Sequence, residues 1–370
     1  MNKFFKELRG KLGFGLMRLP MIGNEVDYNQ VSEMVDEFIA KGFNYFDTAH
    51  GYIDGKSEIA VNKCISSRYK RNEFLLTNKL TENYFDKEED IRPFFYNQLK
   101  TCGVEYFDFY LMHAQNRNNF KHYKKCNAYE TAIKLKEEGK IKHLGISFHD
   151  TNDILDQILT EYPEIEVVQI QLNYLDYEDP EIQSRLCYDV CVKHNKPVLI
   201  MEPVKGGKLA FLPNEAENVF NKLGNSSYAS YAIRFAASLD QVVMVLSGMS
   251  NISQMNNNLS YMADFKKINA VEAKAIKEVV QIFKNIPTIS CTNCKYCVEG
   301  CPKHIPIPML FKDYNNKKLY KNYDGIGNYK RHTENKGKAS DCIKCGKCEY
   351  ICPQHLKIRD LLVEVKETFE

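Results

Sequence analysis

A tandem cysteine pattern near the end of the chain constrains its fold more than any other feature. The sequence C-T-N-C-K-Y-C-V-E-G-C-P begins at Cys291, and C-I-K-C-G-K-C-E-Y-I-C-P begins at Cys342. Both copies follow C-x2-C-x2-C-x3-C-P, the spacing that gives three thiolates to one iron–sulfur cube and the fourth to another. Zinc sites and disulfide frameworks use single four-cysteine or paired sets, not two complete copies of this pattern. The tandem therefore predicts two [4Fe–4S] clusters.

Crossed ligation, in which the last cysteine of each copy serves the other cluster, divides the eight cysteines into two expected sets. One set comprises Cys291, Cys294, Cys297 and Cys352. The other comprises Cys342, Cys345, Cys348 and Cys301.

Composition limits the setting in which the chain works. The formal net charge of +2 gives no case for nucleic acid or for an acidic membrane surface as a partner. Thirteen cysteines, five of them scattered outside the tandem, indicate a reducing interior, because a secreted protein would oxidise them to disulfides. No run of about 18 apolar residues predicts a membrane span. We therefore expect a cytoplasmic protein.

Short apolar, β-rich runs alternate with longer amphipathic segments from the start of the chain. Eight strands, each followed by a helical segment, match a closed (β/α)8 TIM barrel better than an open sheet. No G-x-G-x-x-G follows an early strand, which disfavours an open dinucleotide-binding fold. The expected strands are residues 12–17, 44–48, 73–77, 107–112, 141–147, 166–170, 197–201 and 242–247.

The expected fold class is therefore α/β with two domains. Residues 1–285 form the barrel, and residues 286–370 form a small α+β, ferredoxin-like domain with two [4Fe–4S] clusters.

Polar side chains follow three neighbouring strands of the predicted barrel. Asp47 and Tyr52 follow the second strand, Lys79 the third and His113 the fourth. Because the active sites of such barrels lie at the carboxyl ends of the strands, these side chains are expected to share one pocket. The ordinary pKa of Tyr is about 10, and a neighbouring Lys ammonium lowers it, which makes the phenol a better acid. The alternative is that each residue is a hydrogen-bonded barrel-end group without a catalytic role.

Several segments of the barrel resemble the aldo/keto reductases. Residues 12–20 (LGFGLMRLP) look like their opening strand, and residues 138–147 (EGKIKHLGIS) are close to a consensus run of that family. The strongest signature is FDTA at residues 46–49, with Tyr52 and the later GKSE at residues 55–58. Joined to the cluster tail, essentially the whole chain resembles the iron–sulfur branch of the aldo/keto reductases.

The resemblance implies an NAD(P)-dependent oxidoreductase with a catalytic tetrad of Asp47, Tyr52, Lys79 and His113. Tyr52 would donate a proton to a carbonyl oxygen while nicotinamide delivers hydride. Lys79, held by Asp47, would lower the pKa of Tyr52, and His113 would orient the carbonyl group.

The cofactor contacts implied by the resemblance depart from the family pattern in places. Met201 replaces the usual stacking aromatic residue, Phe148 a usual Asn, and Gln254 the Arg that binds the 2′-phosphate of NADPH. Lys205 or Lys208 could compensate for the missing charge. NADP and NAD are the inferred cofactors, and FMN is an alternative occupant of the pocket. The expected contacts are Ser147, Gln169, Met201, Gly248, Ser250, Gln254 and Asn258.

The segment between the two cysteine motifs is basic. Residues 303–341 carry nine Lys or Arg and four Asp or Glu, an excess of five positive charges. One interpretation is a solvated surface insert. The other is a docking surface for an acidic electron carrier, a ferredoxin or flavodoxin.

Two classes of function follow. The leading hypothesis is an oxidoreductase that transfers hydride and a proton at a carbonyl group of a small-molecule substrate, coupled to one-electron transfer through the clusters. The alternative is a redox-sensing or electron-relay binding module with a degenerate barrel site. Purely structural clusters are a third interpretation.

Overall fold

The computed structural model describes residues 4–224, 226–286, 288–319 and 325–370, which divide into two compact units. Unit 1 contains the described residues of Met1–Glu178, Gln183–Pro203 and Ala232–Ile268. Unit 2 contains those of Asp179–Ile182, Val204–Tyr231 and Asn269–Glu370. The domain boundary expected between residues 285 and 286 stays a prediction, because the two units are defined by packing and divide the chain elsewhere.

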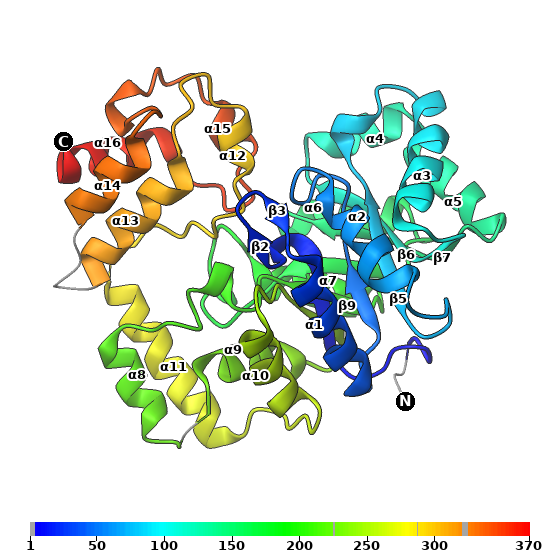
Figure 1. Cartoon of the computed structure of the whole chain (residues 1–370), viewed down its shortest axis with the longest axis horizontal. Coiled ribbons are helices and arrows are strands. Elements are labelled where there is room, and N and C mark those ends of the chain that lie inside the picture. Colours follow the sequence, from blue (N-terminus) through cyan, green and yellow to red (C-terminus); the bar gives the residue numbers. More distant parts are fainter. Residues whose placement is uncertain (1–3, 225, 287, 320–324) are drawn as a thin grey trace. The chain divides into compact units, whose positions relative to one another are not determined.

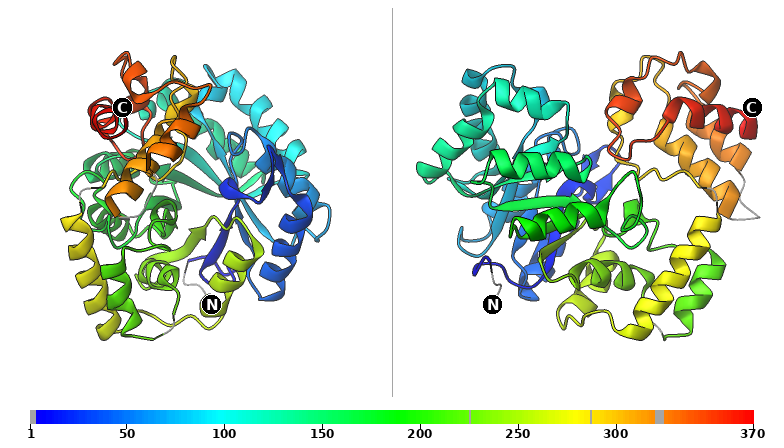
Figure 2. Two further views of the ribbon diagram at one scale, coloured as in Figure 1. Left: turned by 60° about the vertical axis from the view of Figure 1, so that its left-hand side comes forward. Right: turned by 180° about the vertical axis from the view of Figure 1, so that it is seen from behind.

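Eight parallel strands close into a barrel in unit 1, which confirms the predicted TIM barrel (Figures 1 and 2). Neighbours around the barrel follow the order β1-β10-β9-β8-β7-β6-β5-β4, and β1 pairs with both β10 and β4 to close it. The strands are β1 (Leu12–Gly15), β4 (Tyr45–Asp47), β5 (Leu75–Leu80), β6 (Phe107–Gln115), β7 (Ile141–Phe148), β8 (Val167–Gln171), β9 (Val198–Met201) and β10 (Val242–Ser247).

The barrel interior explains why two of its strands carry glycine. A Cβ at Gly13 would lie 2.7 Å from Leu246 Cδ2, and a Cβ at Gly145 would lie 2.5 Å from Val167 Cγ1. Both distances are too short for packed carbon atoms, so these positions leave room for side chains of the neighbouring strands. Leu246 and Val167 belong to the buried hydrophobic cluster inside the barrel. Gly13 thus has a packing role in the first strand.

The amphipathic segments of the sequence predict helices over residues 29–41, 88–101, 128–138, 152–162, 180–194 and 226–238, and each overlaps an observed helix. The largest shift is at α7, which begins at Ser184 instead of Pro180, after Gln183 in a left-handed conformation (φ 54°). A small hairpin of β2 (Met21–Ile22) and β3 (Glu25–Val26) was not predicted. The helices are α1 (Tyr28–Ala40), α2 (Lys56–Val61), α3 (Glu88–Cys102), α4 (Asn119–Lys125), α5 (Ala128–Glu137), α6 (Asn152–Glu161), α7 (Ser184–Lys193) and α10 (Ile252–Met262), while α9 (Tyr228–Ala237) spans both units.

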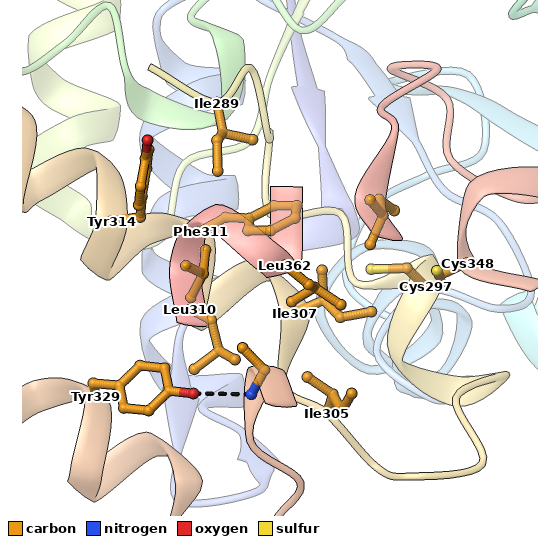
Figure 3. Packing of buried hydrophobic residues seen from close by; sticks show 13 residues of the cluster. Ile289, Cys297, Ile305, Ile307, Leu310, Phe311, Tyr314, Tyr329, Cys348 and Leu362 are labelled. Carbon is orange, nitrogen blue, oxygen red and sulfur yellow. Dashed lines mark hydrogen bonds between the residues drawn. The ribbon is translucent and has the colours of Figure 1, made fainter. Parts of the chain in front are cut away.

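The regular elements described in unit 2 are helices. Helix α8 packs against α11, and α13, α14 and α16 pack against one another (Figures 1 and 2). Figure 3 shows their hydrophobic cluster, in which Leu310 and Phe311 of α13 are fully buried and Cys297 and Cys348 lie at one side. The helices are α8 (Asn214–Asn221), α11 (Ala270–Asn285), α12 (Tyr296–Glu299), α13 (Ile307–Leu319), α14 (Gly325–Thr333), α15 (Lys347–Tyr350) and α16 (Ile358–Phe369).

The loop that follows strand β9 packs against the first cysteine motif within unit 2. Gly206 has a positive φ of 65°, and a Cβ there would overlap the backbone carbonyl of Thr292. Lys208 Nζ donates a hydrogen bond to Thr288 Oγ1 at 2.7 Å. The residues after β9 therefore support the segment that carries Cys291.

None of the helices described in either unit has the length and apolar character needed to cross a membrane.

Candidate active site and cluster-binding loops

The four expected catalytic residues come together at the carboxyl ends of β4, β5 and β6. Lys79 Nζ lies 2.6 Å from Asp47 Oδ1 and donates to the Thr48 carbonyl at 2.8 Å and to the Tyr52 hydroxyl at 3.3 Å. The ring centroids of Tyr52 and His113 are 6.2 Å apart. Lys79 is fully buried, so its ammonium group is held by oxygen atoms and not by bulk water. The ammonium group thus joins the carboxylate to the phenol.

The electrostatics of Tyr52 differ from the expectation. Burial raises the pKa of Tyr52 well above its usual value, and the carboxylates of Asp47 and Glu202 raise it further, while Arg18 opposes them. Burial also lowers the pKa of Lys79, with Asp47 acting in the opposite direction. The expected lowering of the pKa of Tyr52 by Lys79 is therefore outweighed, because the phenolate would be desolvated beside two negative charges. Tyr52 keeps its proton.

His113 is held as a neutral imidazole. Burial lowers the pKa of His113 well below its usual value, and the nearby Lys79 and His149 act in the same direction. Its Nδ1 lies 2.7 Å from Thr81 Oγ1. If the hydroxyl of Thr81 donates this bond, Nε2 carries the proton and can donate a hydrogen bond to a substrate oxygen.

A buried network behind Lys79 was not predicted as part of the site. Glu58 is fully buried, and it accepts hydrogen bonds from Asn78 Nδ2 at 2.8 Å and from Gln98 Nε2 at 3.1 Å. The other carboxylate oxygen lies 2.8 Å from His50 Nδ1. Gln98 also donates to the carbonyl of Lys79 at 3.1 Å, which fixes the end of strand β5. The GKSE segment that ends in Glu58 was the available signal in the sequence.

Arg18 and Glu202 form a second unpredicted feature of the site. Arg18 follows β1 and Glu202 follows β9, and Arg18 Nη2 lies 3.3 Å from Glu202 Oε1. Both charges act on the pKa of Tyr52. The stem of Arg18 also covers Gly248, where a Cβ would lie 3.4 Å from Arg18 Cβ. Their positions immediately after barrel strands are the signal that could have identified them.

Ser147 and Gln169, two of the expected cofactor contacts, lie next to the tetrad. Ser147 Oγ accepts a hydrogen bond from the Ala114 amide at 2.8 Å. Gln169 Nε2 donates to Asp47 Oδ2 at 3.1 Å. Both side chains are buried, and a hydroxyl and an amide at strand ends are groups that suit the carboxamide of nicotinamide.

The remaining expected contacts lie at the ends of β9 and β10. Met201 ends β9 and is half-buried, with no aromatic ring to stack on a cofactor. Asn258 is engaged within the chain, since its Nδ2 donates to Ser247 Oγ at 2.9 Å and its Oδ1 accepts from Tyr261 at 2.5 Å.

Near the start of α10, the exposed side chain of Gln254 accepts from the amide of Ser250 at 2.8 Å. Lys205 is buried, and Lys208 bonds to Thr288 within unit 2. The idea that these lysines replace the missing Arg gains no support.

One of the two cysteine sets that crossed ligation implies lines a single small cavity between the two motifs, together with Ile305 and Leu362. Burial raises the pKa of Cys297, and the neighbouring Cys294, Cys291, Cys352 and Cys348 raise it further, so thiols of both sets lie near this residue. Several thiols packed into a desolvated space suit a polynuclear iron cluster, which supplies the positive charge that thiolates need. The cavity-lining cysteines are Cys301, Cys342, Cys345 and Cys348.

Comparison with protein families agrees with the barrel and its site. The model of the aldo/keto reductase family matches residues 11–281. The chain belongs to the aldo/keto reductase family. A 4Fe-4S dicluster domain matches residues 290–356, so this aldo/keto reductase carries a ferredoxin-type domain.

Relatives of this aldo/keto reductase are distant in sequence. The 9,11-endoperoxide prostaglandin H2 reductase of Trypanosoma cruzi is 24% identical over 269 residues, which cover 71% of this chain and 88% of the relative. An aldo-keto reductase from Klebsiella pneumoniae, solved in complex with NADPH, has a TM-score of 0.60 and 20% identity and covers 73% of this chain and 90% of its own. The holo form of an aldo-keto reductase from Bacillus halodurans has a TM-score of 0.59 and 23% identity, with coverages of 73% and 91%. These two structures show the fold alone.

Proposed function

We propose that this aldo/keto reductase reduces the carbonyl group of a small molecule with a nicotinamide dinucleotide, and that two [4Fe–4S] clusters link it to one-electron transfer. The observation that carries the proposal is the bridge made by Lys79 Nζ, 2.6 Å from Asp47 Oδ1 and 3.3 Å from the Tyr52 hydroxyl. That bridge joins a protonated acid to the cation needed to stabilise its conjugate base.

The barrel residues divide the protonic part of the reaction among themselves. A bound nicotinamide supplies the hydride for the carbonyl carbon. Tyr52 gives its proton to the carbonyl oxygen, and the ammonium group of Lys79 stabilises the phenolate that forms. Asp47 keeps Lys79 charged and in place, and neutral His113 donates a hydrogen bond that orients the carbonyl group.

The nicotinamide end of the cofactor fits this site better than the 2′-phosphate end does. Ser147 and Gln169 offer buried polar groups beside the tetrad. The relative solved with NADPH supports NADP and gives no support to FMN. However, Gln254 cannot give a charge-assisted hydrogen bond to a 2′-phosphate. NADPH and NADH should therefore have KM values within about tenfold of each other.

The cysteines of the tail would hold the clusters in two crossed sets, and the clusters carry single electrons when bound. Cys301, from the first motif, belongs with Cys342, Cys345 and Cys348, as their shared cavity suggests. We place such a protein in the cytoplasm, with an acidic ferredoxin or flavodoxin as the external electron carrier.

Replacing Tyr52 by Phe tests the barrel chemistry. In anaerobically purified protein with NADPH and a simple aldehyde, Y52F should lower kcat by about 10²- to 10⁴-fold, the contribution of general acid catalysis, with unchanged iron content. Y84F, which removes the hydroxyl of a more exposed tyrosine, is the matched control and should keep its activity. Full activity in Y52F would contradict the tetrad assignment.

A second candidate function is a redox-sensing or relay module with a degenerate barrel site. Met201 and Gln254 favour it, because they replace cofactor-binding groups of the family. Adding NADPH anaerobically and following the visible cluster absorption separates the candidates. Bleaching together with aldehyde reduction supports the enzyme with coupled clusters. The absence of both bleaching and turnover supports the binding module.

A further inference from the structure

The second cysteine motif exposes an unusual amount of apolar side chain. The exposed fractions are 57% for Ile343, 72% for Tyr350 and 44% for Ile351. Single exposed apolar residues are ordinary, but these three lie within nine positions of one another, around the exposed Cys345. A cluster ligand and large apolar groups therefore reach the surface in the same place.

A surface hollow joins this region to the first motif. It lies between α12 and α15, which pack against each other. Its lining includes Cys297 from one ligand group and Cys345 from the other, together with Tyr296, Tyr350 and Ile351. The hollow is thus where both sets of ligands approach solvent.

Basic residues accompany the lining of this hollow. Lys347 lines it, and Lys295 and Lys344, each adjacent in sequence to a lining residue, are exposed. Glu299 is also exposed, but Glu349 is neutralised by Arg359, with Glu349 Oε2 2.7 Å from Arg359 Nη2. A net positive rim around an apolar centre is the arrangement that a polar-rimmed protein interface uses.

We propose that this hollow docks an acidic one-electron carrier protein. The cluster face, defined as Ile343, Lys344, Lys347, Tyr350 and Ile351, would contact the carrier. Tyr350 and Ile351, which line the hollow, supply the desolvated centre, where aromatic side chains contribute most to binding, and the exposed Ile343 stands two residues before the lining Cys345. The lysines attract an acidic partner and raise the rate of encounter. The proposal rests on the clusters of the proposed function.

The basic insert, residues 303–341 between the two motifs, is the competing docking surface. Lys317 and Lys318 at the end of α13 are exposed, and Lys318 Nζ lies 5.2 Å from the centroid of the Tyr314 ring. Lys321, the third lysine expected to act there, lies outside the described residues. The insert carries none of the eight motif cysteines, and electron transfer slows steeply with distance, so the cluster face offers the shorter path.

Charge reversal on each surface gives a matched pair of variants. The holoprotein is reduced with dithionite and desalted, and its reoxidation is followed by stopped flow with a plant-type [2Fe–2S] ferredoxin as the acidic probe. K344E/K347E should lower the second-order rate at low salt by about tenfold or more, with the difference shrinking at high salt. K317E/K318E carries the same change in net charge and should change the rate less than about twofold. The small neutral acceptor 1,4-benzoquinone, which charge reversal does not steer, should oxidise every variant at similar rates.

Y350S tests the apolar centre. It should slow electron transfer to ferredoxin at both salt concentrations, with iron content unchanged.

Equal effects of the two lysine pairs, a larger effect of K317E/K318E, or no effect of either would overturn the proposal. A change of oligomeric state in K344E/K347E would also overturn it, since the face would then bind a second copy. Protein that retains no iron would overturn the proposed function itself, together with this inference. Failure of NADPH-dependent aldehyde reduction alone would leave this assay intact, because the clusters are reduced chemically.

Discussion

Burial, more than any neighbouring cation, decides the protonation state of Tyr52. Burial raises the pKa of Tyr52 well above its usual value, while burial and Lys79 lower the pKa of His113 well below its own. The two shifts move the titrations apart, so that a protonated phenol and a neutral imidazole coexist over a wide pH range. A proton donor and a neutral hydrogen-bond donor are the forms that carbonyl reduction requires.

The pH dependence of the reaction follows from these directions. Neutral His113 persists above its lowered pKa, and protonated Tyr52 persists below its raised pKa. We therefore expect kcat/KM for a non-ionising aldehyde to stay flat through about pH 6.5, the ordinary pKa of His, and to fall only on the alkaline side, where Lys79, whose pKa burial lowers, gives up its proton. Steady-state rates across these pH values, with iron content checked at each pH, make the measurement. A fall centred near pH 6.5 would show that His113 titrates normally and would contradict the assignment.

The same shift in His113 acts on stability in a defined direction. Below pH 6.5 the unfolded chain binds a proton that the folded chain does not, so this residue makes the fold lose stability as pH falls.

At the scale of elements, the loop after β9 contacts the cluster segment at the backbone level within unit 2. Gly206 and Gly207 both have positive φ, at 65° and 97°, but only Gly206 lies against Thr292. A Cβ at Gly207 would meet no atom within 4 Å. Both glycines thus adopt a backbone conformation with positive φ, but only Gly206 is also in close contact with Thr292.

Replacing each glycine by alanine separates these effects. G206A should release iron to a chelator several-fold faster than wild type, because the added Cβ pushes Thr292 and the neighbouring Cys291 out of place. G207A adds backbone strain of about 1–3 kcal/mol without the overlap and should hold iron longer than G206A. Iron release followed by visible absorption is the measurement. Equal rates for the two variants would remove the positioning role of Gly206.

The barrel strands could be predicted from sequence because short apolar runs alternate regularly with amphipathic segments. Each of the eight predicted strands overlaps an observed one. The hairpin Met21–Val26 escaped prediction because strands of two residues leave no periodic pattern. The start of α7 was placed too early, since the turn through Gln183 shows no breaker residue in the sequence.

Prediction of the site was limited to residues that neighbouring strands bring together. Asp47, Tyr52, Lys79 and His113 follow neighbouring strands, so closure of the barrel necessarily brings them together. Pairing of Arg18 with Glu202 depends on strands far apart in sequence, β1 and β9, and on the left-handed conformation of Glu202 (φ 55°). The direction of the pKa shift in Tyr52 depends on burial, which spacing does not report.

At the scale of the whole molecule, we expect unit 2 to depend on metal in a way that unit 1 does not. Its cysteine loops carry only the four-residue helices α12 and α15, too short to be stable alone. Cys297 and Cys348 also belong to the buried hydrophobic cluster of the tail. The barrel has its own core and a closed sheet.

Removing iron with a chelator should therefore act on one unit. Hydrogen exchange should rise in residues 291–301 and 342–352, while the strands of the barrel keep their protection. Samples treated with chelator already saturated with iron serve as the control. Loss of protection throughout the chain would show that the two units unfold as one, and no loss anywhere would show that the tail folds without metal.

The position of Cys301 has a consequence for how such a chain can change over generations. Cys301 ends the first motif but lines a cavity with three cysteines of the second. With the crossed ligand sets proposed above, each motif would be incomplete without the other, and a gene that lost one copy would lose both metal centres at once. The stretch between them is also constrained, because α13 and α14 supply Leu310, Phe311 and Tyr329 to the buried hydrophobic cluster of the tail. The two motifs and the helices between them would therefore be inherited as one unit.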